Sequence, residues 1–185
     1  SINKAKELYS ELTFYSDINS ILNSNIDAVF ISSPAKTHNE LVKMSLKAKK
    51  HVFVEKPLCL NYEEGVELKK LANKSNLKLM VGHLLLYHPA FIALKKVIDS
   101  GAIGSIRYIY SNRLSLGKLR KEEDALWSFA PHDISMILAL IGDEPVKVQA
   151  TGGAYLSPNI ADTSVTLLSF KKPHNDWKKI VPSRG

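Results

Sequence analysis

The chain has 185 residues, 45% of them hydrophobic, and a single cysteine, which argues against both a disordered chain and a disulfide framework. It shows no apolar run long enough to span a bilayer and no leader pattern at its N-terminus, so we expect a cytoplasmic protein. The formal net charge is +7, but no aromatic residues interleave with the densest lysine cluster, which favours a solvated helix face or an anionic small-molecule substrate over nucleic acid.

The first half of the sequence predicts strands and helices in alternation, joined by short connections. In chain order we expect a helix at 5–12, a strand at 13–15, a short helix ending at 22, a strand at 26–34, a helix from 38, a strand at 51–55, a helix from 62 to about 72 and a strand at 77–82. Three positions have the pattern of a helix cap: Asp17, Thr37 with Glu40, and Asn61 with Glu64. Apolar strands separated by helices indicate a parallel sheet covered by helices.

The pattern changes after Gly82. We expect a helix from Pro89 to about 99, a half-buried strand at 106–114, a charged loop at 118–124, a helix that opens at Pro131 and ends at Gly142, and strands near 146–155 and 163–170. The tail from residue 171 has no clear period. Longer strands with fewer helices indicate an α+β domain with a mainly antiparallel sheet. The expected domains are residues 1–86 and 87–185, and the expected fold class is α/β followed by α+β.

The tripeptide Glu55-Lys56-Pro57 stands at the exit of a predicted buried strand. Ligands of open parallel sheets bind beyond the carboxyl ends of the strands. A lysine there suits a hydrogen-bond donor, a proton carrier or a Schiff-base nucleophile, Glu55 is placed to hold its ammonium group, and Pro57 can fix the turn, also in the cis form. Taken alone, the tripeptide favours an ordinary surface turn by about two to one.

The segment Ser32–His38 follows the neighbouring strand and leads into a helix. Free backbone N–H groups at such helix starts bind anions, so a phosphate or ribose contact is one interpretation. A routine strand-to-helix loop is equally compatible with these residues.

His132 falls in the first turn of the helix predicted to open at Pro131. The positive end of the helix dipole favours neutral imidazole there, which suits a general base. Asp133 can simply complement that dipole, and a lone histidine at such a place is usually structural.

Four further residues favour structural roles. Trp127 and Phe129 are interpreted as core residues rather than a ligand platform. His83 and His88 flank an apolar run with no cysteine or carboxylate at ligand spacing, so we expect no metal site.

Five segments taken in order carry a family resemblance over about residues 5–170: "DAVFISSPAKTH", "HVFVEKPL", "VGHLLLYHPAF", "SGAIGSIRYIYSNR" and "PHDISMIL". Together they resemble the glucose–fructose oxidoreductase / inositol dehydrogenase / MocA (Gfo/Idh/MocA) family. The stretch from Ser111 to Leu138 looks most similar to its sugar-nucleotide branch, the UDP-N-acetylglucosamine 3-dehydrogenase type. The resemblance implies a Rossmann domain that binds NAD or NADP, joined to an α+β domain with an open antiparallel sheet, with the sugar between them.

The resemblance also implies roles for individual residues. Lys56 would hydrogen-bond the reacting hydroxyl, Pro57 would help to aim it, and His132 would be the general base. Residues implied to line the cofactor are Ser32, Pro34, His38, Glu55, Lys56 and Pro57. Asn112 and Arg113 are implied substrate contacts, Arg113 through a planar fork that suits phosphate or carboxylate. A homodimer or tetramer through the open sheet is expected by analogy.

The sequence departs from the family pattern in two ways. Ser128 stands four residues before His132, where the family commonly has Asp, so Asp133 or Glu55 would have to supply the negative charge. No G-x-G-x-x-G turn is present to seat a pyrophosphate. We therefore expect a piece of a longer enzyme, truncated at both ends, that binds NAD(P) poorly or not at all by itself. Alternatives are a dehydrogenase of inositol or a free sugar, a biliverdin-type reductase, and a non-catalytic binding or scaffold protein.

Overall fold

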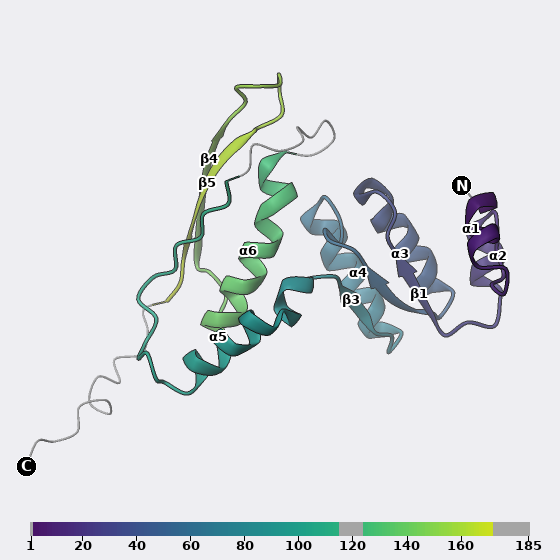
Figure 1. Ribbon diagram of the computed structural model, residues 1–185, viewed down its shortest axis with the longest axis horizontal. Coiled ribbons are helices and arrows are strands. Elements are labelled where there is room, and N and C mark those ends of the chain that lie inside the picture. The colour runs from purple at the N-terminus through teal and green to yellow at the C-terminus, as the bar shows by residue number, and fades with distance from the viewer. Residues whose placement is uncertain (1, 115–123, 172–185) are drawn as a thin grey trace, which may run out of the picture. The chain divides into compact units, whose positions relative to one another are not determined.

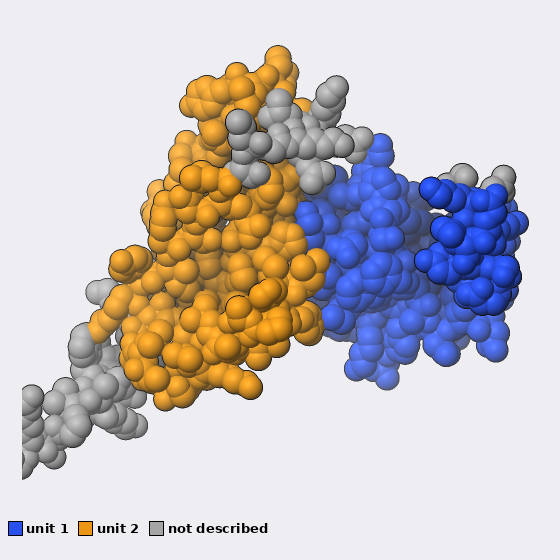
Figure 2. Space-filling model, viewed as in Figure 1, with its two compact units in different colours: residues 1–82 blue, residues 83–185 orange. Residues whose placement is uncertain are grey.

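The computed structural model describes residues 2–114 and 124–171 (Figure 1). The chain divides into two compact units, Ser1–Gly82 and His83–Gly185, which Figure 2 distinguishes by colour. The predicted alternation of strands and helices falls in the first unit and the antiparallel strands fall in the second. Residues 118–123 of the predicted charged loop, and the tail from residue 172, lie outside the described residues.

The first unit is built on a parallel sheet of three strands in the order β1-β2-β3. The strands are β1 (Ala28–Ile31), β2 (His51–Val54) and β3 (Leu79–Val81), as the sequence predicted. Ile31 pairs with Val54, and Val54 pairs with Val81. All three strands therefore end at one edge of the sheet.

Two amphipathic helices, α3 (His38–Lys47) and α4 (Tyr62–Lys74), cover one face of this sheet (Figure 1). The core between them is entirely aliphatic and consists of Ile31, Val42, Leu46, Val52, Val54, Leu68 and Ala72. Leu68 is fully buried, so its truncation to alanine would cost about 2–5 kcal/mol in transfer and cavity terms. This core fixes the positions at which the strands end.

The opposite face of the sheet is also apolar but lies open. Phe30, Phe53 and Met80 are register partners on adjacent strands and so share this face. The rings of Phe30 and Phe53 are stacked, with centroids 4.6 Å apart and an interplanar angle of 12°. Phe30 is 62% exposed and Met80 40%. The predicted apolar character of both faces is confirmed, but α3 and α4 cover only one of them.

Two of the three predicted caps are present. The Asp17 carboxylate accepts a hydrogen bond from the Ser20 backbone N–H (2.8 Å) ahead of α2 (Ile18–Leu22). The Asn61 side chain accepts one from the Glu63 N–H (2.8 Å) at the start of α4. Each bond satisfies a backbone donor that the helix leaves unpaired.

The predicted capping box at Thr37 is wrong. A 3-10 turn, η1 (Ala35–Thr37), precedes α3, and Thr37 already has a helical backbone conformation. Its hydroxyl turns back to donate to the Pro34 carbonyl (2.8 Å). The helix therefore starts from a turn instead of from an extended cap residue.

The N-terminal segment differs from the prediction in detail. Helix α1 spans Ile2–Leu8, earlier than the predicted 5–12, and residues 13–15 form no strand. Further on, the Lys50 ammonium group donates to the carbonyls of Ser24 (3.2 Å) and Ile26 (2.8 Å). These bonds join the residue before β2 to the loop that precedes β1.

The second unit begins with η2 (Leu84–Tyr87), α5 (Pro89–Asp99) and α6 (Ala125–Ile141). Pro89 opens α5 as predicted, and Gly142 ends α6 with a φ of 73°, a left-handed conformation that glycine adopts without strain. Among the helices of residues 2–114 and 124–171, none has the length and apolar character that a membrane span requires.

Helix α6 starts six residues earlier than predicted. Asp124 caps it by accepting from the Trp127 N–H (2.8 Å), and Pro131 lies inside the helix instead of opening it. A proline is common at a helix start, and inside a helix it removes one backbone hydrogen bond, yet α6 continues past Pro131 to Ile141. This moves His132 from the first turn to the middle of α6.

Two antiparallel strands, β4 (Lys147–Gly153) and β5 (Thr163–Ser169), complete the second unit and confirm the prediction for this region. The Asp162 carboxylate closes their connection by accepting from the backbone N–H groups of Tyr155 (2.7 Å) and Leu156 (2.6 Å). The strand predicted at 106–114 is wrong, because these residues form no strand. Alternating apolar and polar residues are compatible with a strand that has one buried face, but a strand also needs a neighbouring strand to pair with.

Candidate active site

The carboxyl edge of the three-stranded sheet gathers the predicted site residues of the first unit. The Glu55 N–H donates to the Ile31 carbonyl (2.9 Å), and the Gly82 N–H donates to the Val54 carbonyl (2.8 Å). Backbone hydrogen bonds therefore still join neighbouring segments at the point where the chain leaves the strands. Ligands of open parallel sheets bind at such an edge.

Lys56 follows directly at the exit of β2. Its peptide bond to Pro57 is cis, and Pro57 is buried while Lys56 is only partly buried. The Glu55 carboxylate lies against the end of β3, since a Cβ added at Gly82 would come within 3.2 Å of Glu55 Oε2. The turn is thus anchored through its proline, and it presents the lysine at the edge.

His38 joins the two loops that leave β1 and β2. Its ring is 1% exposed, with Nδ1 2.6 Å from the Pro57 carbonyl oxygen and Nε2 2.8 Å from the Ser33 carbonyl oxygen. The resemblance implied that His38 lines the cofactor, but its ring is enclosed and both nitrogens are engaged. His38 therefore acts on the sheet edge by contacting the carbonyl oxygens of Pro57 and Ser33.

Ser32 and Pro34, the other implied cofactor residues of this loop, are exposed at the sheet edge. Between them, the Ser33 hydroxyl shares a 2.6 Å hydrogen bond with the Thr37 hydroxyl. The loop is therefore internally braced and offers the Ser32 side chain to a ligand.

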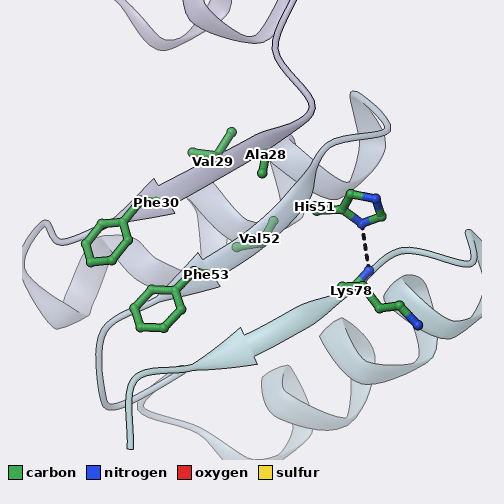
Figure 3. A pocket seen from close by; sticks show the side chains of 7 residues that line it. All are labelled: Ala28, Val29, Phe30, His51, Val52, Phe53 and Lys78. Carbon is green, nitrogen blue, oxygen red and sulfur yellow. Dashed lines mark hydrogen bonds between the residues drawn. The ribbon is translucent and has the colours of Figure 1, made fainter. Parts of the chain in front are cut away.

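A separate apolar hollow of about 360 Å³ lies on the open face of the sheet (Figure 3). Its lining residues are Ala28, Val29, Phe30, His51, Val52, Phe53 and Lys78. His51 Nδ1 accepts from the Lys78 backbone N–H (2.9 Å), at the amino ends of β2 and β3. The hollow begins at the amino ends of the strands, where Ala28, His51 and Lys78 line it. It is therefore separate from the predicted site at their carboxyl ends.

His132 lies in the third turn of α6 and is partly buried. The prediction that a helix-start dipole keeps its ring neutral is therefore wrong, because the dipole effect is confined to the first turn. Ser128, 4% exposed, lies four residues earlier on the same helix face. The residue where the family commonly has Asp is thus a buried neighbour of His132 along the helix.

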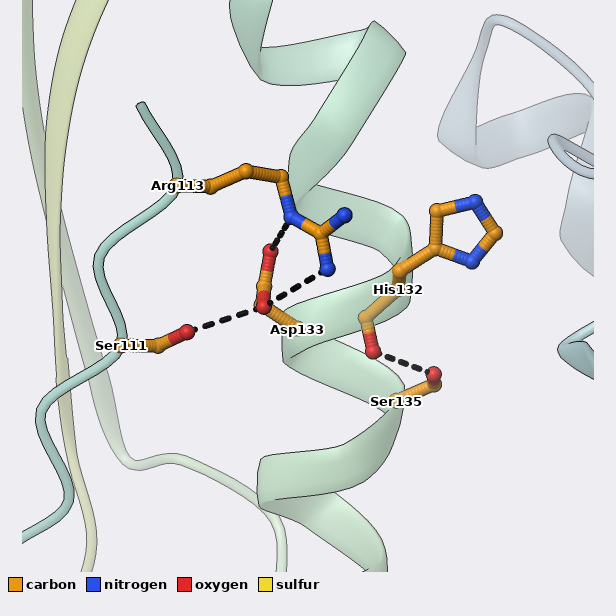
Figure 4. Close-up of polar contacts among 5 residues, drawn as sticks. All are labelled: Ser111, Arg113, His132, Asp133 and Ser135. Atoms are coloured by element: carbon orange, nitrogen blue, oxygen red, sulfur yellow. Dashed lines mark hydrogen bonds and ion pairs between the residues drawn. The ribbon is translucent and has the colours of Figure 1, made fainter. Parts of the chain in front are cut away.

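Asp133 ties the segment before residue 114 to α6 (Figure 4). Its carboxylate accepts from the Ser111 hydroxyl (2.9 Å), from Arg113 Nε (2.9 Å) and from Arg113 Nη2 (3.3 Å). Its side chain is 16% exposed, against 37% for Arg113. The predicted role of Asp133 as a helix-dipole partner is wrong, because it lies well beyond the first turn of α6.

The same view separates Asp133 from the histidine ring. In Figure 4 the His132 imidazole points away from the side on which Asp133 meets Arg113. The expectation that Asp133 supplies charge to His132 is not met by this geometry. Arg113, an implied substrate contact, uses two of its nitrogens on Asp133, and its neighbour Asn112 is exposed.

Sequence patterns gave Ser33 no role, and they assigned Asp133 to the helix dipole or to His132, whereas its carboxylate binds Ser111 and Arg113. His83 lies two residues after the end of β3, and burial lowers the pKa of its imidazole. Among residues 2–114 and 124–171, no group of three His, Cys, Asp or Glu side chains is placed to hold a metal ion.

By the family resemblance, the carboxyl edge is where the nicotinamide end of a dinucleotide would lie. Gly82 is closely packed, since a Cβ added there would lie 3.2 Å from Glu55 Oε2 and 3.3 Å from Phe53 Cζ, so the glycine lets both side chains approach the end of β3. Ser32 and Lys56 supply polar groups to the same edge. The sequence offers no G-x-G-x-x-G turn for the pyrophosphate, so this expectation concerns only the reactive end.

Comparisons with known proteins match both units. Residues 2–83 match the model of the oxidoreductase family with an NAD-binding Rossmann fold, and residues 91–173 match the GFO/IDH/MocA C-terminal domain. The chain is 32% identical over 154 residues to UDP-N-acetylglucosamine 3-dehydrogenase of Acidithiobacillus ferrooxidans, covering 82% of this chain and 48% of that protein. It is 31% identical over 144 residues to inositol 2-dehydrogenase of Rhizobium meliloti, covering 75% and 44%.

The solved structures agree with these matches. The crystal structure of the Acidithiobacillus enzyme matches with a TM-score of 0.76 and 30% identity, covering 90% of this chain and 54% of that one. The chain spans about half the length of the curated relatives it matches.

Proposed function

We propose, on the premise that the chain belongs to the Gfo/Idh/MocA oxidoreductase family, that it holds reacting residues of an NAD(P)-dependent dehydrogenase. The reaction moves a hydride between the hydroxyl-bearing carbon of a sugar or sugar nucleotide and a nicotinamide. The main support is the placement of Lys56 at the carboxyl edge of the sheet, on a turn anchored by Pro57 and His38.

Lys56 acts as the hydrogen-bond donor to the reacting oxygen. An ammonium group directed at that oxygen stabilises negative charge as the hydroxyl proton departs. His132 accepts this proton as the general base, which converts the hydroxyl to a carbonyl once the hydride has left the carbon. When bound, the nicotinamide supplies the hydride acceptor. Lys56 and His132 belong to different units, and the family pattern assigns them to one reaction.

A sugar nucleotide is the favoured substrate class. A UDP-sugar carries negative charge, which the net charge of +7 attracts, and one relative is a UDP-N-acetylglucosamine 3-dehydrogenase. Arg113, which Asp133 ties to α6, is the cation proposed to bind a phosphate, although Asp133 already engages two of its nitrogens. Inositol is the second substrate candidate, because another relative is an inositol 2-dehydrogenase.

A non-catalytic binding or scaffold role is the alternative from a different class. The printed sequence contains no G-x-G-x-x-G turn, and that turn seats the pyrophosphate in dinucleotide-binding folds, so cofactor binding has to be tested with such a turn supplied. Under this alternative the protein would use its surface to bind a partner and would not transfer hydride.

The two proposals are separated with an extended protein, in which a glycine-rich βαβ segment from a relative is joined ahead of residue 1. Calorimetry with NAD and NADP would be run on the chain alone and on the extended protein, followed by cofactor-reduction assays with UDP-N-acetylglucosamine and myo-inositol. We expect weak or no binding by the chain alone, and binding with substrate-dependent reduction by the extended protein. Cofactor binding without reduction on any of these substrates would contradict the dehydrogenase and favour the scaffold.

A further inference from the structure

We propose that His38 is a positioning residue for Lys56: its ring links the loop after β1 to the turn after β2 and so sets where the lysine stands. The link itself is a property of the first unit. Only the importance of the lysine rests on the proposed function.

The geometry of the ring supports this role. Nδ1 lies 2.6 Å from the carbonyl oxygen of Pro57, 19 residues away in sequence, and Nε2 lies 2.8 Å from that of Ser33. Carbonyl oxygens only accept hydrogen bonds, so the ring makes both bonds at once when both nitrogens carry protons, and one of them as neutral imidazole. In either form its partners are backbone groups of the two strand-end loops.

Burial makes these bonds matter. His38 is 1% exposed and Pro57 is buried, so a carbonyl that loses its ring donor is not readily solvated by water. His38 is also the first residue of α3, whose Val42 and Leu46 are in the sheet core. The ring is therefore carried by a helix that packs into the core of the unit, and it links the turn to that helix.

The Pro57 carbonyl is one residue from Lys56, so the Nδ1 bond bears on the lysine more directly than the Nε2 bond does. Losing the Pro57 bond frees the turn that holds the lysine. Losing the Ser33 bond frees the loop that holds Ser32. The two halves of the link thus have different consequences, which a merely space-filling histidine would not produce.

Cys59 is a native reporter of the turn. It lies two residues beyond Pro57, is partly buried, and its Sγ contacts the Asn61 carbonyl (3.1 Å) at the start of α4. A Cβ at Gly65 would lie 3.2 Å from this sulfur, so the thiol is packed against the first turn of α4. It is the single cysteine of the chain, so alkylation reads this turn alone and needs no cofactor.

Two variants separate the halves of the link. An asparagine side chain places its amide near the position of Nδ1, and a glutamine side chain places its amide near that of Nε2. His38→Asn can therefore keep the Pro57 bond, and His38→Gln can keep the Ser33 bond. Val42→Ala, a core truncation on the same helix, is the control for general loss of stability.

The experiment measures iodoacetamide alkylation of Cys59 in the full chain, alongside urea unfolding of each variant. We expect His38→Gln to be alkylated roughly threefold to tenfold faster than the original chain, the factor that loss of one net hydrogen bond allows. His38→Asn and Val42→Ala should stay within about twofold of the original chain.

Equal acceleration in the Asn and Gln variants, or acceleration in Val42→Ala at matched stability, would overturn the proposal, because the ring would then act only through general packing. An unchanged rate in His38→Gln would overturn it as well. The assay contains no cofactor or sugar, so failure of the dehydrogenase proposal leaves its result unaffected.

Discussion

The two units hold their candidate reacting residues by different means. In the first unit, a buried imidazole bonds to two backbone carbonyls behind Lys56. In the second unit, the carboxylate next to His132 bonds to the side chains of Ser111 and Arg113 at the surface. The first arrangement is enclosed by an aliphatic core, while the second is within reach of solvent and salt.

This difference bears on how far each site can adjust. Backbone carbonyls cannot be replaced by substitution and hardly move once the core has packed, so the lysine edge is fixed by the fold. A partly exposed ion pair gains little net free energy and weakens as ionic strength rises. We infer that the first unit holds its candidate residues more rigidly than the second unit does.

The largest effect should come from removing the buried ring. His38→Leu keeps the volume but removes the ring from the buried Pro57 carbonyl and the part-buried Ser33 carbonyl, and we expect it to lower the free energy of unfolding of the first unit by about 3 kcal/mol. Urea denaturation followed by circular dichroism measures this loss. A loss below about 1 kcal/mol would show that the two short contacts contribute little, and the comparison between the units would fail.

A smaller effect is expected in the second unit. Asp133→Ala removes three hydrogen bonds at a partly exposed position, and we expect a loss of about 1 kcal/mol that shrinks further in high salt. The same urea titration at low and high ionic strength measures it. A loss as large as that of His38→Leu, independent of salt, would mean that the Asp133 cluster is as rigid as the His38 link.

The smallest effect sets the baseline. Lys43 and Glu67 form a 2.6 Å ion pair between α3 and α4, with side chains 33% and 55% exposed. Lys43→Ala should change the unfolding free energy by only a few tenths of a kcal/mol, as exposed pairs do. A change above about 1 kcal/mol would show that exposed pairs in this chain are unusually strong, and the Asp133 result would need reinterpretation.

The thiol beside the lysine turn gives a pH-dependent measure of its enclosure. Burial raises the pKa of Cys59 from its ordinary value of 9.0, so less thiolate is present at a given pH and alkylation is slow. The alkylation rate should reach half its maximum above pH 9.0 in the original chain. A midpoint at or below pH 9.0 would indicate that the turn is open to water.

Local rules predicted much of the fold. Asn61 was identified as a cap because its role depends only on the next three residues. The strands of the first unit were found because their apolar runs are short and bounded. Thr37 and Pro131 were misjudged because each has two local uses, cap or turn for the threonine and helix start or helix interior for the proline. Tertiary packing decided between these uses.

The site was harder to predict than the fold. Lys56 stood out by its position at the exit of a strand, but the His38 ring finds its Pro57 partner 19 residues away. Asp133 finds Ser111 22 residues away. No periodic pattern reports contacts of that separation. The sequence could therefore nominate the charged residues but not the groups that hold them.

The assignment of Lys56 as donor to the reacting hydroxyl is tested most directly by kinetics of Lys56→Ala in the extended protein, with the exposed Lys69→Ala as the matched control. Turnover and cofactor dissociation constant would be measured for both variants with UDP-N-acetylglucosamine as substrate. We predict that Lys56→Ala lowers kcat by about a hundredfold or more, the scale of a lost acid–base or hydrogen-bonding group, with cofactor affinity nearly unchanged. Near-normal turnover in Lys56→Ala, equal to that of Lys69→Ala, would contradict the account.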